Sequence, residues 1–147
     1  MSATEPARPA RAVPEVGEEL IRRTVPITRT TLVRYAGASG DFNPIHHDDV
    51  RAAAVDLPGV IAHGMATLGI AAAVVEEWAG SPAAVRDVST RFSRPVVVPA
   101  GDGTEIEVVA RAGAVDGDTV RVDVDVTHEG VSVLTRARVV VDLTLAS

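Results

Sequence analysis

The chain has 147 residues, of which 46% are hydrophobic and 23% charged, a balance typical of one globular domain and not of a wholly disordered chain. It contains no cysteine, which excludes disulfides, thiolate nucleophiles and cysteine metal sites. Its formal net charge of −6 predicts no general attraction to nucleic acid or to anionic membranes, so we expect neither as a partner.

The first residues show no targeting signal. Residues 1–13 are rich in Ala, Pro, Arg and Glu and lack the apolar run of a signal peptide, so we expect a flexible N-terminal tail there. The longest apolar stretch, residues 62–75, is too short to cross a bilayer. We therefore expect a soluble, cytoplasmic protein with a single domain over residues 14–147.

The first half of that domain reads as mainly helical. A strand is expected over residues 21–27, weakened or placed at a sheet edge by Pro26. Helical spacing then runs from Thr28, a candidate cap, to Ser39, and Gly40 ends it. A loop, a short helix over residues 48–54 and a helix over residues 64–78 follow. The last helix is apolar nearly all round, so we expect other structure to enclose it.

After Pro82 the hydrophobic period changes to two, which is typical of strands. Turn signals at residues 101–103, 116–117 and 129–130 separate the alternating runs, and a last strand is expected over residues 131–143. Short connections predict an antiparallel meander with one apolar face. The fold class expected from these patterns is α+β, with the sheet packed on the apolar helix.

The loop after the first helix holds the best candidates for chemistry. Asp41, Asn43 and His46 supply a carboxylate, an amide and an imidazole, and Pro44 stiffens the turn between them. A carboxylate and an imidazole held in this way could share one water and move its protons. The alternative is that Asp41 and Asn43 close turns and cap helices, while His46 is a hydrogen-bonded surface residue.

A second segment, Ala-His-Gly-Met at residues 62–65, opens the apolar helix. The N–H groups at a helix start have no partner in the helix and lie at its positive end, so the N–H of Gly64 could stabilise the oxyanion of a thioester substrate. The alternative is that Gly64 only allows close packing. His63 is interpreted as a structural histidine whose hydrogen bonds are satisfied.

These two segments, Tyr35 to His46 and Ile61 to Met65, resemble the hydratase-2 motif of MaoC-like dehydratases and (R)-specific enoyl-thioester hydratases. Within that family the chain is most similar to the catalytic beta subunit of actinobacterial (3R)-hydroxyacyl-ACP dehydratase. The resemblance covers residues 16–145 and includes Arg91-Phe92 and Pro95-Val96. The chain departs from the family pattern at Asp49, where a proline often stands.

The resemblance implies a hot-dog fold, a curved antiparallel sheet wrapped around one long central helix. It implies that Asp41 and His46 are a catalytic dyad, that Asn43 orients substrate or water, and that the Gly64 N–H binds the thioester oxygen. It also implies (R) stereochemistry, no metal and no cofactor. The substrate would be an acyl-CoA or acyl-ACP, and the domain would pair as a homodimer or as a heterodimer with a second hot-dog subunit.

Three functions remain open from the sequence. The first is reversible hydration of trans-2-enoyl thioesters to (3R)-3-hydroxyacyl thioesters by a hydro-lyase. The second is an acyl thioesterase, and the third is a non-catalytic acyl-binding subunit of a heteromeric dehydratase. A metal set of Asp41, His46 and His63 is the weaker explanation of the histidines. Four arginines are interpreted as solvated strand residues, with contacts to CoA phosphates or to an acidic carrier protein as the alternative: Arg91, Arg94, Arg136 and Arg138.

Overall fold

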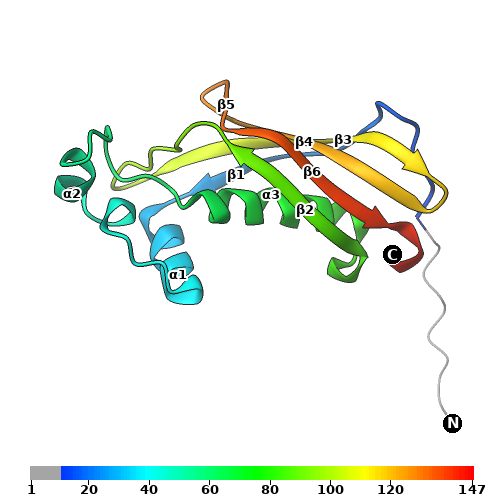
Figure 1. Ribbon diagram of the computed structural model, residues 1–147, viewed down its shortest axis with the longest axis horizontal. Coiled ribbons are helices and arrows are strands. Elements are labelled where there is room, and N and C mark those ends of the chain that lie inside the picture. The colour runs from blue at the N-terminus through cyan, green and yellow to red at the C-terminus, as the bar shows by residue number, and fades with distance from the viewer. Residues whose placement is uncertain (1–10) are drawn as a thin grey trace, which may run out of the picture.

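A computed structural model describes residues 11–147 of the chain as a curved antiparallel sheet with one long helix along its concave face (Figure 1). The strands lie in the order β1-β3-β4-β6-β2, and β5 pairs with β4. In chain order the elements are β1 (Glu19–Ile27), α1 (Arg29–Ser39), η1 (Pro44–His46), α2 (Asp49–Ala53), α3 (Gly64–Ala79), η2 (Pro82–Ala84), β2 (Val85–Phe92), β3 (Thr104–Asp116), β4 (Thr119–His128), β5 (Val131–Ser132), β6 (Leu134–Asp142) and η3 (Leu143–Leu145).

The core lies between the concave face of the sheet and α3. Alternate strand residues such as Ile106, Val122 and Val139 are at most 1% exposed, and Val75 and Ala79 of α3 are fully buried in the same cluster. The period of two in the strands therefore places one face of the sheet on the helix. The predicted α+β class and the single sheet wrapped on one long helix are confirmed.

Local capping signals set the ends of the first helices. The hydroxyl of Thr28 accepts from the N–H of Thr31, the hydroxyl of Thr31 accepts in return from the N–H of Thr28, and Gly40 ends α1 at a φ of 76°. Asp48 caps α2 by accepting from Val50 and Arg51. Because each cap depends on residues close in sequence, these boundaries were predictable.

The predicted order of strand pairing is wrong at one connection. The turn at residues 101–103 was expected to join neighbouring strands, but β2 pairs with β6 and β3 pairs with β1. The chain instead crosses from the edge strand β2 to β3, which lies next to the opposite edge strand β1. A turn signal marks where a strand begins without specifying its neighbour, so the pairing was not readable from the residues.

The last strand is broken rather than continuous. It was expected to run over residues 131–143, but β5 ends at Ser132 and β6 begins at Leu134. Between them the N–H of Val133 donates to the carbonyl of Val126 at 3.0 Å, and further on Arg136 adopts a φ of 53°. Both irregularities bend the chain where it passes to its place between β4 and β2.

The expectation that other structure encloses α3 holds only on the sheet side. Met65 is 58% exposed, and Gly69 and Ala73, one and two turns further on, are also exposed. One sheet covers one side of a helix, so a narrow stripe of α3 stays uncovered within the described chain.

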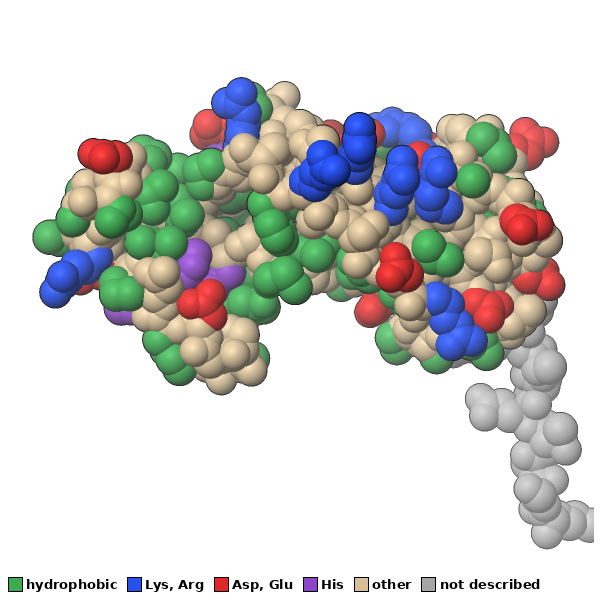
Figure 2. Space-filling model, in the orientation of Figure 1, with side chains coloured by type: hydrophobic (Ala, Val, Ile, Leu, Met, Phe, Trp, Pro, Cys, Tyr) green, Lys and Arg blue, Asp and Glu red, His purple; other side chains and the backbone are tan. Residues whose placement is uncertain are grey.

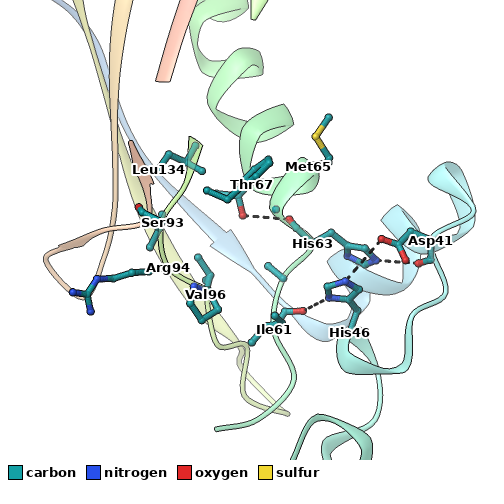
Figure 3. A pocket seen from close by; sticks show the side chains of 15 residues that line it. Asp41, His46, Ile61, His63, Met65, Thr67, Ser93, Arg94, Val96 and Leu134 are labelled. Carbon is teal, nitrogen blue, oxygen red and sulfur yellow. Dashed lines mark hydrogen bonds and ion pairs between the residues drawn. The ribbon is translucent and has the colours of Figure 1, made fainter. Parts of the chain in front are cut away.

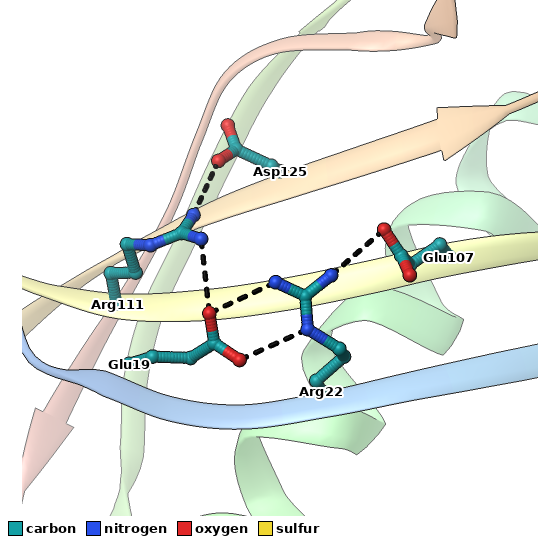
Figure 4. Close-up of polar contacts among 5 residues, drawn as sticks. All are labelled: Glu19, Arg22, Glu107, Arg111 and Asp125. Atoms are coloured by element: carbon teal, nitrogen blue, oxygen red, sulfur yellow. Dashed lines mark hydrogen bonds and ion pairs between the residues drawn. The ribbon is translucent and has the colours of Figure 1, made fainter. Parts of the chain in front are cut away.

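The convex face of the sheet carries charge in place of apolar side chains (Figure 4). Arg22 contacts Glu19 and Glu107, and Arg111 contacts Glu19 and Asp125, each at 3.0 Å. Hydrogen bonding by Arg22 lowers the pKa of Glu19 below its usual value. Exposed pairs of this kind contribute little to stability, and they keep the outer face polar.

The N-terminal tail expected over residues 1–13 falls mostly outside the described part of the chain. Within that part, the guanidinium of Arg11 lies 5.3 Å from the centre of the Trp78 ring. Among the helices in residues 11–147, none has the length and apolar content needed to cross a membrane.

Candidate active site

A cleft of about 440 Å³ opens at the N-terminal end of α3. Figure 2 shows histidine side chains between hydrophobic ones on this part of the surface, at the end of the molecule that holds α1 and α2. Four segments far apart in sequence supply the walls: the loop before α2, the start of α3, the end of β2 with the chain after it, and the junction of β5 and β6. Its lining residues are Asp41, His46, Ile61, Ala62, His63, Gly64, Met65, Thr67, Phe92, Ser93, Arg94, Pro95, Val96, Val133 and Leu134.

The turn that follows α1 fixes the direction of the Asp41 carboxylate. The N–H of Asp41 donates to the hydroxyl of Ser39 at 3.1 Å, and its Oδ1 accepts from the N–H of Asn43 at 3.1 Å. The second oxygen, Oδ2, faces His46 (Figure 3). The side chain is 51% exposed, so water reaches this carboxylate freely.

His46 lies on η1 with its ring largely buried. Its Nδ1 is 2.7 Å from the carbonyl of Ile61, and a carbonyl only accepts, so the proton of the neutral ring is assigned to Nδ1. Nε2 then carries a lone pair and lies 3.9 Å from Oδ2 of Asp41. The side chain is only 9% exposed, which restricts the ring to this orientation.

Oδ2 of Asp41 and Nε2 of His46 are too far apart for a direct hydrogen bond. They are close enough for both to accept hydrogen bonds from one water molecule. A water about 2.8 Å from each atom fits this separation and can donate one hydrogen to the carboxylate and one to the imidazole. The structure thus brings Asp41 and His46 together on one wall of the cleft, as the motif spacing predicted. A water held in this way has its oxygen lone pairs free for attack on a substrate.

Asn43 is placed differently. Its side-chain oxygen accepts from the N–H of Ile45 at 3.2 Å and begins η1, while its own N–H bonds the Asp41 carboxylate. It is not one of the residues that line the cleft. In the described chain Asn43 therefore shapes the turn that carries Asp41 and His46, and a direct contact with substrate stays a prediction.

Gly64 begins α3 and lines the cleft. The side chain of the capping residue, His63, makes no capping hydrogen bond, and the N–H groups of Gly64 and Met65 have no acceptor in the part of the chain that the structure describes. A Cβ at Gly64 would lie 2.8 Å from the ring of Phe92, so only glycine lets this ring pack against the helix start. Both interpretations of Gly64 from the sequence, a free N–H and close packing, fit this geometry.

His63 is 2% exposed and lies against both groups of the pair. Its Nε2 is 3.1 Å from the main-chain carbonyl of Asp41, and its ring stacks on that of His46 with 3.7 Å between centroids (Figure 3). Its Nδ1 is buried without a hydrogen-bond partner in the described residues. The expectation of a structural histidine whose hydrogen bonds are satisfied is therefore wrong, because within residues 11–147 only one of its ring nitrogens has a hydrogen-bond partner.

The same three side chains are the candidate metal ligands. Their ligand atoms lie within 4.8 Å of one another. Imidazole binds metal ions in the plane of its ring, with Zn–N bonds of about 2.0–2.1 Å. The stacked rings of His46 and His63 are tilted by only 24° with 3.7 Å between centroids, so their lone pairs lie in two nearly parallel planes and cannot both point at one ion. The arrangement does not fit a metal centre without movement of a ring.

Several parts of the cleft were not predicted as site residues. The carbonyl of Ile61 orients His46 from 15 positions away, and a main-chain group gives no signal in the sequence. Phe92 and Arg94 were noted as motif and charged residues and reach the cleft only because β2 ends beside α3. The signal that could have found His63 is its position directly before a glycine that begins an apolar helix.

Known proteins are similar to this chain in sequence and in fold. The model of the MaoC like domain matches residues 11–131. The 3-hydroxyacyl-thioester dehydratase X of Mycobacterium tuberculosis is 46% identical over 77 residues, 52% of this chain and 26% of the relative. The peroxisomal enoyl-CoA hydratase 2 of Arabidopsis thaliana is 41% identical over 56 residues, 37% of this chain and 18% of the relative.

Two solved structures are similar over most of the described chain. A MaoC-like dehydratase has a TM-score of 0.83 and 38% identity, and the match covers 86% of this chain and 40% of that one. The unliganded R-hydratase PhaJ1 of Pseudomonas aeruginosa has a TM-score of 0.75 and 27% identity, with coverage of 87% and 81%. The chain spans about a quarter of the dehydratase X sequence and 40% of the first of these two structures.

The family match extends from the N-terminal side of the sheet to β5, and it includes the two segments that hold Asp41, His46 and Gly64. The single sheet wrapped on α3 is the hot-dog architecture that these hydratases share. The family match and this architecture lead to the same family assignment. The chain belongs to the MaoC-like domain family.

Proposed function

We propose that this chain is a hydro-lyase that interconverts trans-2-enoyl and (3R)-3-hydroxyacyl thioesters by adding or removing water. One observation carries the proposal: the Asp41 carboxylate and the lone pair of His46 face each other across 3.9 Å in the cleft that also holds the start of α3. The names of its relatives, a 3-hydroxyacyl-thioester dehydratase and an enoyl-CoA hydratase, support the same reaction class.

In the hydration direction, the water held between Asp41 and His46 attacks the β-carbon of the enoyl thioester. A bond forms between the water oxygen and the β-carbon, and the double-bond electrons move to the α-carbon and the thioester carbonyl. The pair accepts one proton from the water and a proton is returned to the α-carbon, so the site ends in its starting protonation state. Proton transfer by a positioned group contributes about 10²- to 10⁴-fold in rate.

The start of α3 would stabilise the charge that builds up on the thioester oxygen. The N–H of Gly64 is free of protein acceptors in the described chain and lies at the positive end of a 16-residue helix. A donor aimed at a developing oxyanion lowers the barrier more than it strengthens substrate binding. The thioester carbonyl would therefore lie against Gly64 while its β-carbon faces the water.

The carrier of the acyl group would be coenzyme A or an acyl carrier protein, and Arg94 in the cleft wall offers a cation to a phosphate of either. We also propose that the domain works with a second hot-dog unit, as a homodimer or a heterodimer. The exposed stripe of α3 and the sheet edges at β1 and β2 support this, because a single domain leaves both uncovered.

The decisive experiment follows crotonyl-CoA and longer enoyl-CoA substrates with the purified protein. Loss of the enoyl ultraviolet band without release of free thiol is the expected result, and chiral analysis of the product is expected to give the (3R) alcohol. Release of thiol would show a thioesterase instead. Absence of both signals, alone and with a partner hot-dog subunit, would show a non-catalytic acyl-binding chain.

A further inference from the structure

His63 connects the two groups of the proposed dyad. Its Nε2 lies 3.1 Å from the main-chain carbonyl of Asp41, and its ring stacks on the His46 ring at 3.7 Å with a tilt of 24°. On its other side the ring of Tyr35 lies 4.7 Å away at an angle of 57°. A side chain that is 2% exposed and touches both groups controls their separation through packing.

The main-chain carbonyls fix the tautomers of the two stacked rings. A carbonyl only accepts, so the neutral His63 ring carries its proton on Nε2, and the His46 ring carries its proton on Nδ1. The lone pair of His46 is therefore on the nitrogen that faces Asp41. The lone pair of His63 is on Nδ1, buried without a donor in the described part of the chain.

The same arrangement favours the uncharged form of His63. Burial lowers its pKa below the usual value of 6.5, the nearby His46 lowers it further, and the Asp41 carbonyl and carboxylate oppose the shift. A second proton would place an N–H on the buried Nδ1, where no acceptor lies within reach in the described residues. Asp41, His46 and Tyr35 are the titratable groups that face the ring.

We propose that His63 is a positioning residue that acts through Asp41 and His46 by its hydrogen bond and by the face of its ring. Its hydrogen bond holds the main chain of Asp41, and its face supports the ring of His46. Together these contacts set the gap in which the water lies, and a neutral ring does not compete with His46 for a proton. This inference rests on the proposed hydration activity.

The geometry implies a kinetic signature. The cost of misplacing a catalytic group by about 1 Å reaches about 100-fold in rate. Because His63 lies behind the dyad, its loss should lower kcat and leave KM nearly unchanged. A contribution to substrate binding would instead raise KM.

Two variants separate the two contacts of the ring. In His63→Phe a flat ring remains for His46 to stack on, but the donor to Asp41 is lost; in His63→Gln an amide donor remains and the ring is lost. We expect kcat to fall about 30- to 100-fold in His63→Phe and less in His63→Gln, with wild-type KM in both. The matched control is His128→Phe on β4. This histidine hydrogen-bonds Thr104, neither residue lines the cleft, and the kcat of the variant should not change.

A double-mutant cycle distinguishes positioning from general structural damage. In an Asp41→Asn background, His63→Phe should lower the residual kcat by less than about twofold, because the carboxylate whose main chain His63 holds is gone. An equal loss in both backgrounds would overturn the proposal, as would a His63→Phe enzyme with wild-type kcat. Thermal unfolding of each variant checks that the protein is folded.

A measurement on the wild-type protein is independent of activity. Nitrogen-15 NMR of the histidine rings should show His63 as the neutral Nε2–H tautomer from pH 8 down to pH 6, and titration of His63 at its usual pKa would overturn the proposal. If the wild type hydrates no enoyl thioester, the proposed function fails while this spectrum still reports on His63. If the wild type is active and His63→Phe has the same kcat, only the inference about His63 fails.

Discussion

The apolar sheet over α3 and the polar corner at the start of α3 are built in different ways. In the sheet, many valines and alanines of β3, β4 and β6 fill similar places, and each contact resembles its neighbours. In the corner, His46 depends on one carbonyl, Asp41 on one serine and one N–H, and His63 on one carbonyl and one stacked ring. The many similar contacts of the sheet contribute to stability, whereas the single directional contacts of the corner fix the positions of the site groups. Substitutions in the sheet should therefore change the free energy of unfolding, and substitutions in the corner should change the catalytic rate.

The largest effect is expected in the corner and on activity alone. Asp41→Asn and His46→Ala should each lower kcat by about 10²- to 10⁴-fold, because the water loses one of its two acceptors. The exposed carboxylate of Asp41 makes few contacts, so the unfolding midpoint of Asp41→Asn should stay close to wild type. Hydration kinetics with crotonyl-CoA and thermal unfolding measure the two properties.

The matched controls are Asp102→Asn in the exposed turn before β3 and His128→Ala on β4, which should keep wild-type rates. If a folded Asp41→Asn protein hydrated substrate as fast as these controls, the role of the carboxylate would be refuted.

The second effect lies in the sheet and concerns stability. Ile106 of β3 is 1% exposed in the core, so Ile106→Ala should lower the free energy of unfolding by about 2–5 kcal/mol. The kcat of the folded fraction should remain near wild type, because this residue does not line the cleft. Urea denaturation measures the stability change. A fall in kcat comparable to that of Asp41→Asn, without loss of stability, would contradict the division between the two regions.

A smaller effect is expected where the two regions meet. In Gly64→Ala the new methyl group lies too close to the ring of Phe92, which is 53% exposed and can turn outward into the cleft. The displaced ring should lower kcat/KM by about 10- to 100-fold while the unfolding midpoint changes little. Gly37→Ala on α1, where a Cβ meets open space, is the matched control and should keep full activity. Equal activity of both variants would show that the helix start does not contact substrate.

The smallest effect is a dependence of stability on pH. The pKa of His63 is lowered in the folded protein, so the unfolded chain binds a proton that the native site does not. Stability is therefore expected to decline as the pH falls below about 6.5, before the carboxylates with lowered pKa values, such as Glu19 and Asp142, begin to titrate. His63→Phe should remove this decline between pH 6.5 and 5, measured by urea unfolding at each pH. An unchanged decline in His63→Phe would assign it to another group.

Much of the sheet region was predictable because its signals are local and repeated. The alternation in residues 119–126 identified a strand without knowledge of its neighbours, and the caps at Thr28 and Asp48 lie within three residues of the N–H groups they bind. The pairing of β2 with β6 was missed because it joins segments about 50 residues apart. Repetition marks a strand, and only the packed molecule selects its partner.

The candidate site divides in the same way. The resemblance and the spacing of Asp41, His46 and Gly64 identified three residues that the structure brings to one cleft. Asn43 closes the turn through hydrogen bonds with residues close in sequence, and its expected role in orienting substrate or water stays a prediction. The number of residues between two side chains limits how far apart they can lie. It does not determine the direction in which each side chain points.

The sequence by itself determined a two-residue period in the second half, an apolar helix that begins at Gly64, and a carboxylate and an imidazole five positions apart on a stiff turn. Tertiary structure decided which lone pair of His46 is free and what lies behind its ring. The free lone pair depends on the carbonyl of Ile61, 15 residues after His46. The support behind the ring depends on the face of His63, 17 residues after His46. Directional contacts between distant segments exist only when the sheet has closed on the helix, and for that physical reason no local pattern encodes them.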